Sequence, residues 1–289
     1  DFSNYMQVNN FFKKHSPTVV IMAVAKVGGI FANKTYPSDF ILDNLKIQNN
    51  IIENAWKHGV KRLLFLGSSC IYPKYSSQPI NEESLLTSSL ETSNEYYAIA
   101  KIAGLKLCSA LRKQYSFDAI CLMPTNLYGE GDNYHITNSH VLAALIRRFY
   151  EASNNNQSEV ICWGSGKPRR EFMNVEDMGS AAVFTLENWN PENTNFIKNK
   201  NNDEPLNYLN VGTGIDISIK ELAEMIAYKF DYKGKIIWDE SKPDGTPVKL
   251  LNVSRINAIG WKAKIDLETG LERTIRNFKE NYNSGKLRL

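Results

Sequence analysis

Hydrophobic residues alternate along the chain between short continuous runs and longer stretches with helical spacing. The continuous runs predict strands that are buried on both faces, and they occupy residues 18–24, 62–67, 119–123 and 160–163. The longer stretches predict amphipathic helices, and they occupy residues 39–58, 95–113 and 141–152. Such an alternation favours a parallel sheet with right-handed crossovers and helices on both faces. The pattern therefore predicts an α/β protein with a doubly wound sheet.

The last third of the chain follows a different pattern, which predicts a smaller α/β unit. Ser218 and Glu221 form a capping box, the sequence signature of a helix start. A short strand over residues 235–238 and a terminal helix over residues 267–282 follow. The preceding stretch, residues 188–207, is rich in asparagine and predicts a surface loop.

Composition excludes several classes of protein. The chain has 289 residues, of which 43% are hydrophobic, enough for one large domain or two small ones. Its net charge of +3 is weaker than that of proteins bound to nucleic acid or acidic membranes, so we expect neither partner. The longest apolar run, residues 19–25, is far shorter than the about 20 residues of a membrane span. The four scattered cysteines include no C-x-x-C pair, so we predict no metal site and a reduced, cytoplasmic protein.

The sequence contains no glycine-rich phosphate loop, although a doubly wound sheet favours a dinucleotide site. Its 17 glycines form three G-x-G pairs, and none has the third glycine that G-x-G-x-x-G requires. One interpretation is that the chain binds no nucleotide. The other is that the chain begins after this unit, which takes roughly 30 to 40 residues. The absence of an initiator methionine favours the second interpretation, and we expect an N-terminally truncated cofactor domain.

Tyr97 and Lys101 form a candidate catalytic pair. Their spacing places both side chains on one face of the predicted helix, one turn apart. A neighbouring ammonium favours ionised tyrosine, so the phenol can deliver a proton near neutral pH. About one such Y-x-x-x-K match is expected by chance in a chain of this kind. A second match, Tyr282 to Lys286, contains Gly285 and follows no strand, and we interpret it as chance.

The context of the first match supports a catalytic role. The strand over residues 62–67 ends in Ser68 and Ser69, and ligands bind at the carboxyl ends of parallel strands. A serine hydroxyl at that edge can donate a hydrogen bond to a substrate carbonyl. Taken alone, the two serines would indicate a turn.

Ser68, Tyr97 and Lys101 together resemble the Ser–Tyr–Lys triad of the extended short-chain dehydrogenase/reductases. The dehydratases of that superfamily carry Asp-Glu where this chain has Ser69 and Cys70, so dehydration is disfavoured. Longer segments resemble the GDP-L-fucose synthases, which are epimerase/reductases of GDP-4-keto-6-deoxymannose. These segments are GSSCIYP (67–73), NEYYAIAKIAG (94–104), MPTNLYG (123–129), NSHV (138–141), WGSG (163–166), REF (170–172) and KPDGT (242–246).

The resemblance implies a two-stage reaction with NADP(H) as cofactor. Cys70 and His140 are implied as the acid/base pair that exchanges protons at C3 and C5, beside a ketone at C4; thiol and imidazole groups titrate near neutral pH. On residues alone, His140 is more simply a helix cap or a surface histidine. Hydride from NADPH then reaches C4, where Tyr97 protonates the alkoxide, Ser68 polarises the carbonyl and Lys101 binds the nicotinamide ribose.

The resemblance also implies binding residues, a domain division and an assembly. The other implied cofactor-binding residues are Leu66, Gly67, Ser69, Pro124, Thr125, Asn126, Leu127 and His140. The implied GDP-sugar residues are Arg148, Trp163, Arg170 and Asp244. We expect a Rossmann-like cofactor domain over residues 1–165 and mainly a substrate domain over residues 166–289, some of whose elements return to the first. A homodimer through the helices over residues 39–58 and 95–113 is implied.

Two other functions remain open at this stage. One is a nucleotide-sugar 4-epimerase or reductase of the same superfamily that recycles tightly held NAD. That chemistry needs no acid/base pair such as Cys70 and His140. The other is a non-catalytic nucleotide-sugar-binding fragment, which the missing glycine-rich loop favours.

Overall fold

Four parallel strands form the main sheet of the computed structural model, which describes residues 1–194, 197–200, 204–242 and 244–289. Their order in the sheet is β1 (Val19–Met22), β2 (Arg62–Leu66), β3 (Ala119–Pro124) and β7 (Tyr208–Val211). All the residues of β3 and β7 are buried, as expected for strands covered on both faces. The predicted α/β class with a parallel sheet is confirmed.

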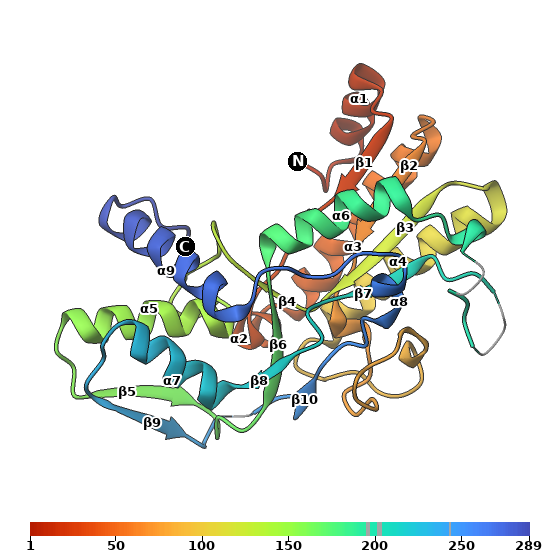
Figure 1. Cartoon of the computed structure of the whole chain (residues 1–289). Coiled ribbons are helices and arrows are strands. Elements are labelled where there is room, and N and C mark those ends of the chain that lie inside the picture. Colours follow the sequence, from red (N-terminus) through yellow and green to blue (C-terminus); the bar gives the residue numbers. More distant parts are fainter. Residues whose placement is uncertain (195–196, 201–203, 243) are drawn as a thin grey trace.

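Helices cover both faces of the main sheet (Figure 1). The long helices α3 (Pro37–Lys57) and α4 (Glu95–Tyr115) pack against each other on one face, and α6 (Val175–Asn188) crosses the other. The shorter helices around this sheet are α1 (Tyr5–His15), α2 (Ile30–Thr35) and α8 (Ser254–Ala258). Gly59 ends α3 with a positive φ of 72°, which glycine adopts without strain.

A second lobe contains its own small sheet and hydrophobic core. Its elements are β5 (Glu159–Trp163), β9 (Lys235–Asp239), α5 (Val141–Asn154), α7 (Ile219–Lys229) and α9 (Leu267–Asn283). The capping box at the start of α7 is present as predicted. The predicted strand over residues 160–163 pairs with β9 and does not join the main sheet, whose fourth strand is β7. Burial alternates along β5, so one of its faces meets solvent.

A third sheet lies between the two lobes. It contains β4 (Asn126–Tyr128), β6 (Arg169–Asn174), β8 (Asp216–Ser218) and β10 (Val248–Lys249), and β6 is paired with each of the others. Short 3₁₀ turns occupy Ser69–Ile71, Glu82–Ser84 and Pro191–Asn193. Helix α5 and strand β5 precede residue 165 but pack in the second hydrophobic core. The division of the chain into two domains at residue 165 stays a prediction.

The predicted surface loop over residues 188–207 is described except for residues 195–196 and 201–203. Trp189, Ile197 and Leu206 are buried in the core of the main sheet. The prediction of an exposed loop is therefore wrong at these three positions, because scattered apolar residues anchor the described parts.

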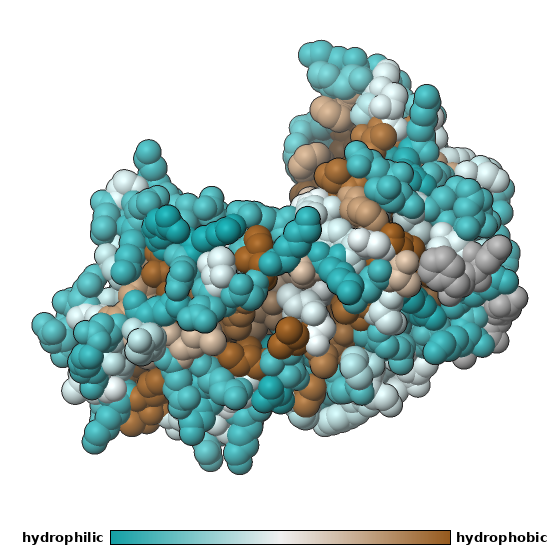
Figure 2. Space-filling model, in the orientation of Figure 1, coloured by the Kyte–Doolittle hydropathy of each residue, from teal (hydrophilic) through white to brown (hydrophobic). Residues whose placement is uncertain are grey.

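Strand β1 forms one edge of the main sheet. Val19 and Ile21 on this strand are about half exposed, at 49% and 46%. Figure 2 shows apolar side chains at the surface around α1 and β1. Among the described helices, none is both long and apolar enough to cross a membrane.

Candidate active site

The segment that follows β2 carries two of the predicted catalytic residues. After Gly67 the chain turns into a 3₁₀ turn, and the Ser68 hydroxyl accepts a hydrogen bond of 3.2 Å from the Cys70 backbone N–H. Ser69 is buried, and a side chain at position 67 would overlap Met123 on the neighbouring strand. The tight fit brings Ser68 and Cys70 to the carboxyl end of the sheet, where α/β proteins bind ligands.

Lys101 lies almost completely buried on α4, with 4% of its surface exposed. Its ammonium donates a hydrogen bond of 2.8 Å to the Leu66 carbonyl, at the end of β2. Burial lowers the pKa of Lys101 to about 8, because the charged form loses its hydration. The Nζ atom is 5.9 Å from the centre of the Tyr97 ring, so the predicted pair is brought together.

The charge state of Tyr97 differs from the expectation. Burial raises the pKa of Tyr97, the nearby Cys70 acts in the same direction, and a hydrogen bond with Ser68 opposes both. Lys101 does not lower the pKa of Tyr97 as expected. Its ammonium is directed to the Leu66 carbonyl. The phenol is therefore protonated, and Ser68 lies close to it.

Two residues that were not predicted from the sequence surround the Cys70 sulfur. The Asn94 side-chain amide donates to Sγ at 3.2 Å, and the Lys249 ammonium lies 3.7 Å from Sγ. Asn94 precedes α4 and Lys249 belongs to β10, so they approach Cys70 from different elements. These two contacts give the half-buried Cys70 thiol a polar, charged environment.

His140 is the residue that precedes α5, and it is exposed to solvent. The protein around its ring nevertheless lowers the pKa of His140, while the Asp132 carboxylate opposes this effect. A side chain that is exposed to solvent and yet surrounded by protein is typical of the wall of a cleft. Gly29 donates a backbone hydrogen bond of 3.0 Å to the carbonyl of Asn138, so a second loop lies against this segment. Among the described residues, no hydrogen bond joins His140 to Cys70 or Tyr97.

The predicted cofactor-binding run leads from β3 into β4, and its residues are Pro124, Thr125, Asn126 and Leu127. Thr125 and Asn126 both donate side-chain hydrogen bonds to the Glu171 carbonyl, at 3.1 and 2.8 Å. Gly67 donates to the Leu122 carbonyl at 2.9 Å. The run therefore lies at the same sheet edge as the end of β2, as predicted.

Glu171 is a fully buried carboxylate that sequence reasoning missed. It accepts backbone hydrogen bonds from Thr213, Gly214 and Leu251 at 2.6, 2.7 and 3.0 Å. Burial raises the pKa of Glu171, and these hydrogen bonds oppose the shift. A side chain on Gly212 would overlap the carboxylate. Glu171 thus holds the loop after β7 and the segment after Lys249 in place.

The predicted substrate residues lie on the third sheet and the second lobe. Arg170 on β6 is paired in register with Lys249 on β10. Burial lowers the pKa of Arg170, while Cys70, Glu91 and Asp244 oppose this effect, so its guanidinium lies among these groups. A pocket of about 200 Å³ borders Gly245, next to Arg170, and its lining residues are Ile30, Lys34, Lys74, Glu91, Thr92, Ser93 and Gly245.

The other three predicted substrate residues each contact different neighbours in the fold. Asp244 accepts from the backbone N–H and the hydroxyl of Ser165 at 2.7 and 2.8 Å. Arg148 on α5 donates to the Ile161 carbonyl at 2.7 Å. Trp163 at the end of β5 leaves 50% of its surface exposed, with the Lys242 ammonium 5.8 Å from its ring centre.

Comparison with known proteins identifies the family. A model of the NAD dependent epimerase/dehydratase family matches residues 1–196. The chain belongs to this family. GDP-L-fucose synthase 1 of Arabidopsis thaliana is 50% identical over 97% of this chain and 83% of the relative. GDP-L-fucose synthase of Escherichia coli (strain K12) is also 50% identical, over 96% of this chain and 84% of the relative.

A solved structure of this epimerase/dehydratase type supports the same placement. The GDP-L-fucose synthetase from Naegleria fowleri bound to NADP has a TM-score of 0.85 at 28% identity, covering 99% of this chain and 84% of that one. The resemblance to the GDP-L-fucose synthases that the sequence motifs indicated is confirmed.

Proposed function

We propose that the chain is an NADPH-dependent enzyme that converts GDP-4-keto-6-deoxy-D-mannose to GDP-L-fucose, by epimerisation at C3 and C5 and reduction at C4. The relatives named GDP-L-fucose synthase support the substrate and the reaction. The structural relative bound to NADP supports the cofactor. The observation that carries the proposal is the position of Cys70, next to the Ser68–Tyr97–Lys101 group and in contact with Lys249.

The epimerisation requires one group that removes a proton and another that returns one. The ketone at C4 acidifies the hydrogens at C3 and C5, so moderate bases suffice. Asn94 and Lys249 both contact the Cys70 sulfur, from different elements of the fold. The lowered pKa of His140 keeps its imidazole neutral, so it can remove a proton from one carbon while the Cys70 thiol returns one to the opposite face. The imidazolium and thiolate formed in this way then exchange roles at the second carbon. We assign Cys70 and His140 to the two faces of the sugar ring.

The reduction uses the Ser68–Tyr97–Lys101 group. NADPH supplies the hydride when bound. Because burial raises the pKa of Tyr97, its phenol carries the proton that the C4 alkoxide needs. Ser68 lies close to the phenol and would polarise the C4 carbonyl. The Lys101 ammonium has three N–H donors. Among the described residues, it donates one hydrogen bond, to the Leu66 carbonyl. The other donors fit the ribose hydroxyls of the cofactor.

The remaining assignments concern binding, assembly and compartment. Arg170, Arg148 and Asp244 suit the diphosphate and ribose of the substrate, and the exposed ring of Trp163 suits stacking on guanine. The lobe of the main sheet would hold the cofactor and the second lobe the nucleotide sugar. A homodimer through α3 and α4 is supported by exposed apolar residues there, such as Ile99 at 42%. The cytoplasm is the proposed compartment.

The test mixes the purified chain with NADPH and GDP-4-keto-6-deoxymannose and follows NADPH oxidation and the sugar product. We expect stoichiometric oxidation and formation of GDP-L-fucose. No NADPH oxidation with this ketone, together with inversion at C4 of a GDP-sugar that carries a C4 hydroxyl, would favour the 4-epimerase. Binding of the GDP-sugar without turnover, and without solvent deuterium entering C3 and C5, would favour the non-catalytic binding protein.

A further inference from the structure

A buried hydroxyl follows Cys70 closely in the sequence. Tyr72, two residues after Cys70, is 2% exposed, and its hydroxyl donates a hydrogen bond of 2.5 Å to the side-chain oxygen of Asn210. Burial strongly raises the pKa of Tyr72, so the hydroxyl stays protonated and acts as the donor. The end of the catalytic segment is therefore tied to β7, the strand that carries Asn210.

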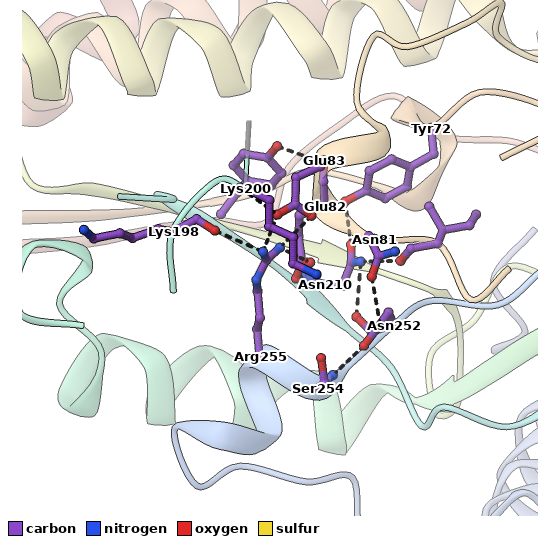
Figure 3. A network of polar contacts seen from close by, with 12 residues as sticks. Tyr72, Asn81, Glu82, Glu83, Lys198, Lys200, Asn210, Asn252, Ser254 and Arg255 are labelled. Carbon is purple, nitrogen blue, oxygen red and sulfur yellow. Dashed lines mark hydrogen bonds and ion pairs between the residues drawn. The ribbon is translucent and has the colours of Figure 1, made fainter. Parts of the chain in front are cut away.

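Asn210 connects this segment to two others. Its side-chain nitrogen donates to the carbonyls of Ile80 and Asn252, at 2.9 and 3.3 Å. A donor on one side and two carbonyl acceptors on the other leave a single orientation for the amide. Figure 3 shows Asn210 between Tyr72 and Asn252. One fully buried side chain thus joins three segments of the chain.

The segment that ends at Asn252 carries Lys249. It runs beside Ile80, which donates to the Leu250 carbonyl at 2.8 Å and accepts from the Asn252 N–H at 2.9 Å. Lys249 in turn reaches the Cys70 sulfur at 3.7 Å. Asn210 therefore holds Tyr72, next to Cys70, on one side, and the segment of Lys249 on the other.

An ion-pair cluster stabilises the far side of this network (Figure 3). Arg255 on α8 donates to Glu82 at 2.7 Å and to Glu83 at 3.0 Å. Glu82 also accepts the Asn210 backbone N–H at 3.1 Å. The hydroxyl of Tyr208 donates to the Glu82 carbonyl at 2.9 Å. Tyr208 is thus a buried hydroxyl of the same network whose hydrogen bond goes to a backbone carbonyl and not to the Asn210 side chain.

We propose that Tyr72 and Asn210 are positioning residues, which together hold the Cys70 sulfur against the Lys249 ammonium. The proposal rests on the proposed function in one respect, the acid/base role of Cys70. Attraction between a cation and a sulfur atom decreases with distance, so loosening either segment weakens the contact between Lys249 and the Cys70 sulfur. The network then acts on proton removal without touching the substrate.

The first test measures the reaction of Cys70 with iodoacetamide near neutral pH, because only the thiolate reacts. Cys108, Cys121 and Cys162 are buried, so the native rate reports Cys70. We expect Tyr72→Phe to lower this rate about three- to tenfold. Tyr208→Phe removes a buried hydroxyl of the same network and is the matched control, which we expect to stay within about twofold of the unaltered chain.

A double variant separates positioning from general weakening of the fold. If Tyr72 acts through Lys249, Tyr72→Phe will change the rate little in a chain that already carries Lys249→Met. Independent, multiplying effects of the two substitutions would overturn the proposal. So would an unchanged rate in Tyr72→Phe. Asn210→Asp keeps the acceptor for Tyr72 and loses the donor to Asn252, and it provides the second variant if Tyr72→Phe folds poorly.

Turnover provides an independent readout. We expect Tyr72→Phe to slow solvent deuterium entry at C3 and C5 and to lower kcat, with KM for the GDP-sugar unchanged. A raised KM with unchanged kcat would contradict a positioning role. If Cys70→Ser retained full deuterium exchange, the assigned function of Cys70 would fail, whereas the alkylation rates would still decide whether the network positions its sulfur.

Discussion

Replacing Lys101 with methionine tests how strongly the fold resists the buried ammonium. Methionine fills a similar volume without the charge. The pKa of Lys101 falls from an ordinary value of 10.5 to about 8 in the folded chain. The unfolded chain therefore binds this proton more tightly, and the charged lysine opposes folding. The cost is complete below about pH 8 and disappears as the pH rises toward the unfolded value.

The size of the effect follows from the two pKa values. The charged Lys101 opposes folding by about 3 kcal/mol near pH 7, and by about 1.5 kcal/mol near pH 9.5. Relative to Lys101→Met, the free energy of unfolding of the unaltered chain should rise by about 2 kcal/mol over this interval. Buried tyrosines such as Tyr97 have raised pKa values and titrate in both proteins, so the difference between the two proteins isolates Lys101.

The assay is urea unfolding at the two pH values without cofactor, followed by circular dichroism. Lys106→Met, on an exposed position of α4, controls for the loss of one lysine. Parallel pH dependence in the unaltered chain and Lys101→Met would refute the reasoning, because it would mean that the ammonium remains hydrated. Lys101→Met should also abolish reduction of the ketone, since the proposed ribose contact is lost.

Four further predictions follow from the site and the fold. Cys70→Ser should stop deuterium exchange at C3 and C5 while reduction of a pre-epimerised ketone survives; undiminished exchange would remove Cys70 from the mechanism. Tyr97→Phe should block NADPH oxidation and leave exchange intact, so normal oxidation would contradict its role as proton donor. Glu171→Gln should lower the free energy of unfolding by about 1 to 3 kcal/mol, because its amide would face backbone N–H donors; equal loss in the exposed control Glu176→Gln would argue against this cause. Ile99→Glu should convert a dimer to monomers in sedimentation, and a monomeric unaltered chain would exclude the proposed interface.

The sequence was sufficient wherever the signal is local. Continuous apolar runs identified the strands β1, β2 and β3. Burial on both faces, which such a run predicts, holds for β2 and β3 but not for β1, whose Val19 and Ile21 are about half exposed at the edge of the sheet. The spacing of Tyr97 and Lys101 placed them on one helix face. Ser68 and Cys70 follow a strand end, and their turn depends on neighbouring residues. Motifs of this kind also sufficed for the family.

The tertiary structure decided what depends on partners far away in the sequence. The run over residues 160–163 predicts a strand, but its pairing with β9 depends on hydrogen-bond partners that a short apolar run does not specify. The direction of the Lys101 ammonium depends on the Leu66 carbonyl. Lys249 reaches Cys70 from β10, whose chain Glu171 holds two residues later by accepting a hydrogen bond from the Leu251 N–H.

Sequence by itself therefore determined the class of fold and the family, and it supplied the candidate reacting groups, because each of these signals lies in residues close together in the chain. The tertiary structure alone decided their environment. Burial raises the pKa of Tyr97 and lowers that of Lys101, and both shifts arise from protein packed around the side chains. Such packing is set by contacts between distant segments, as in the joining of Tyr72 and Asn252 by Asn210.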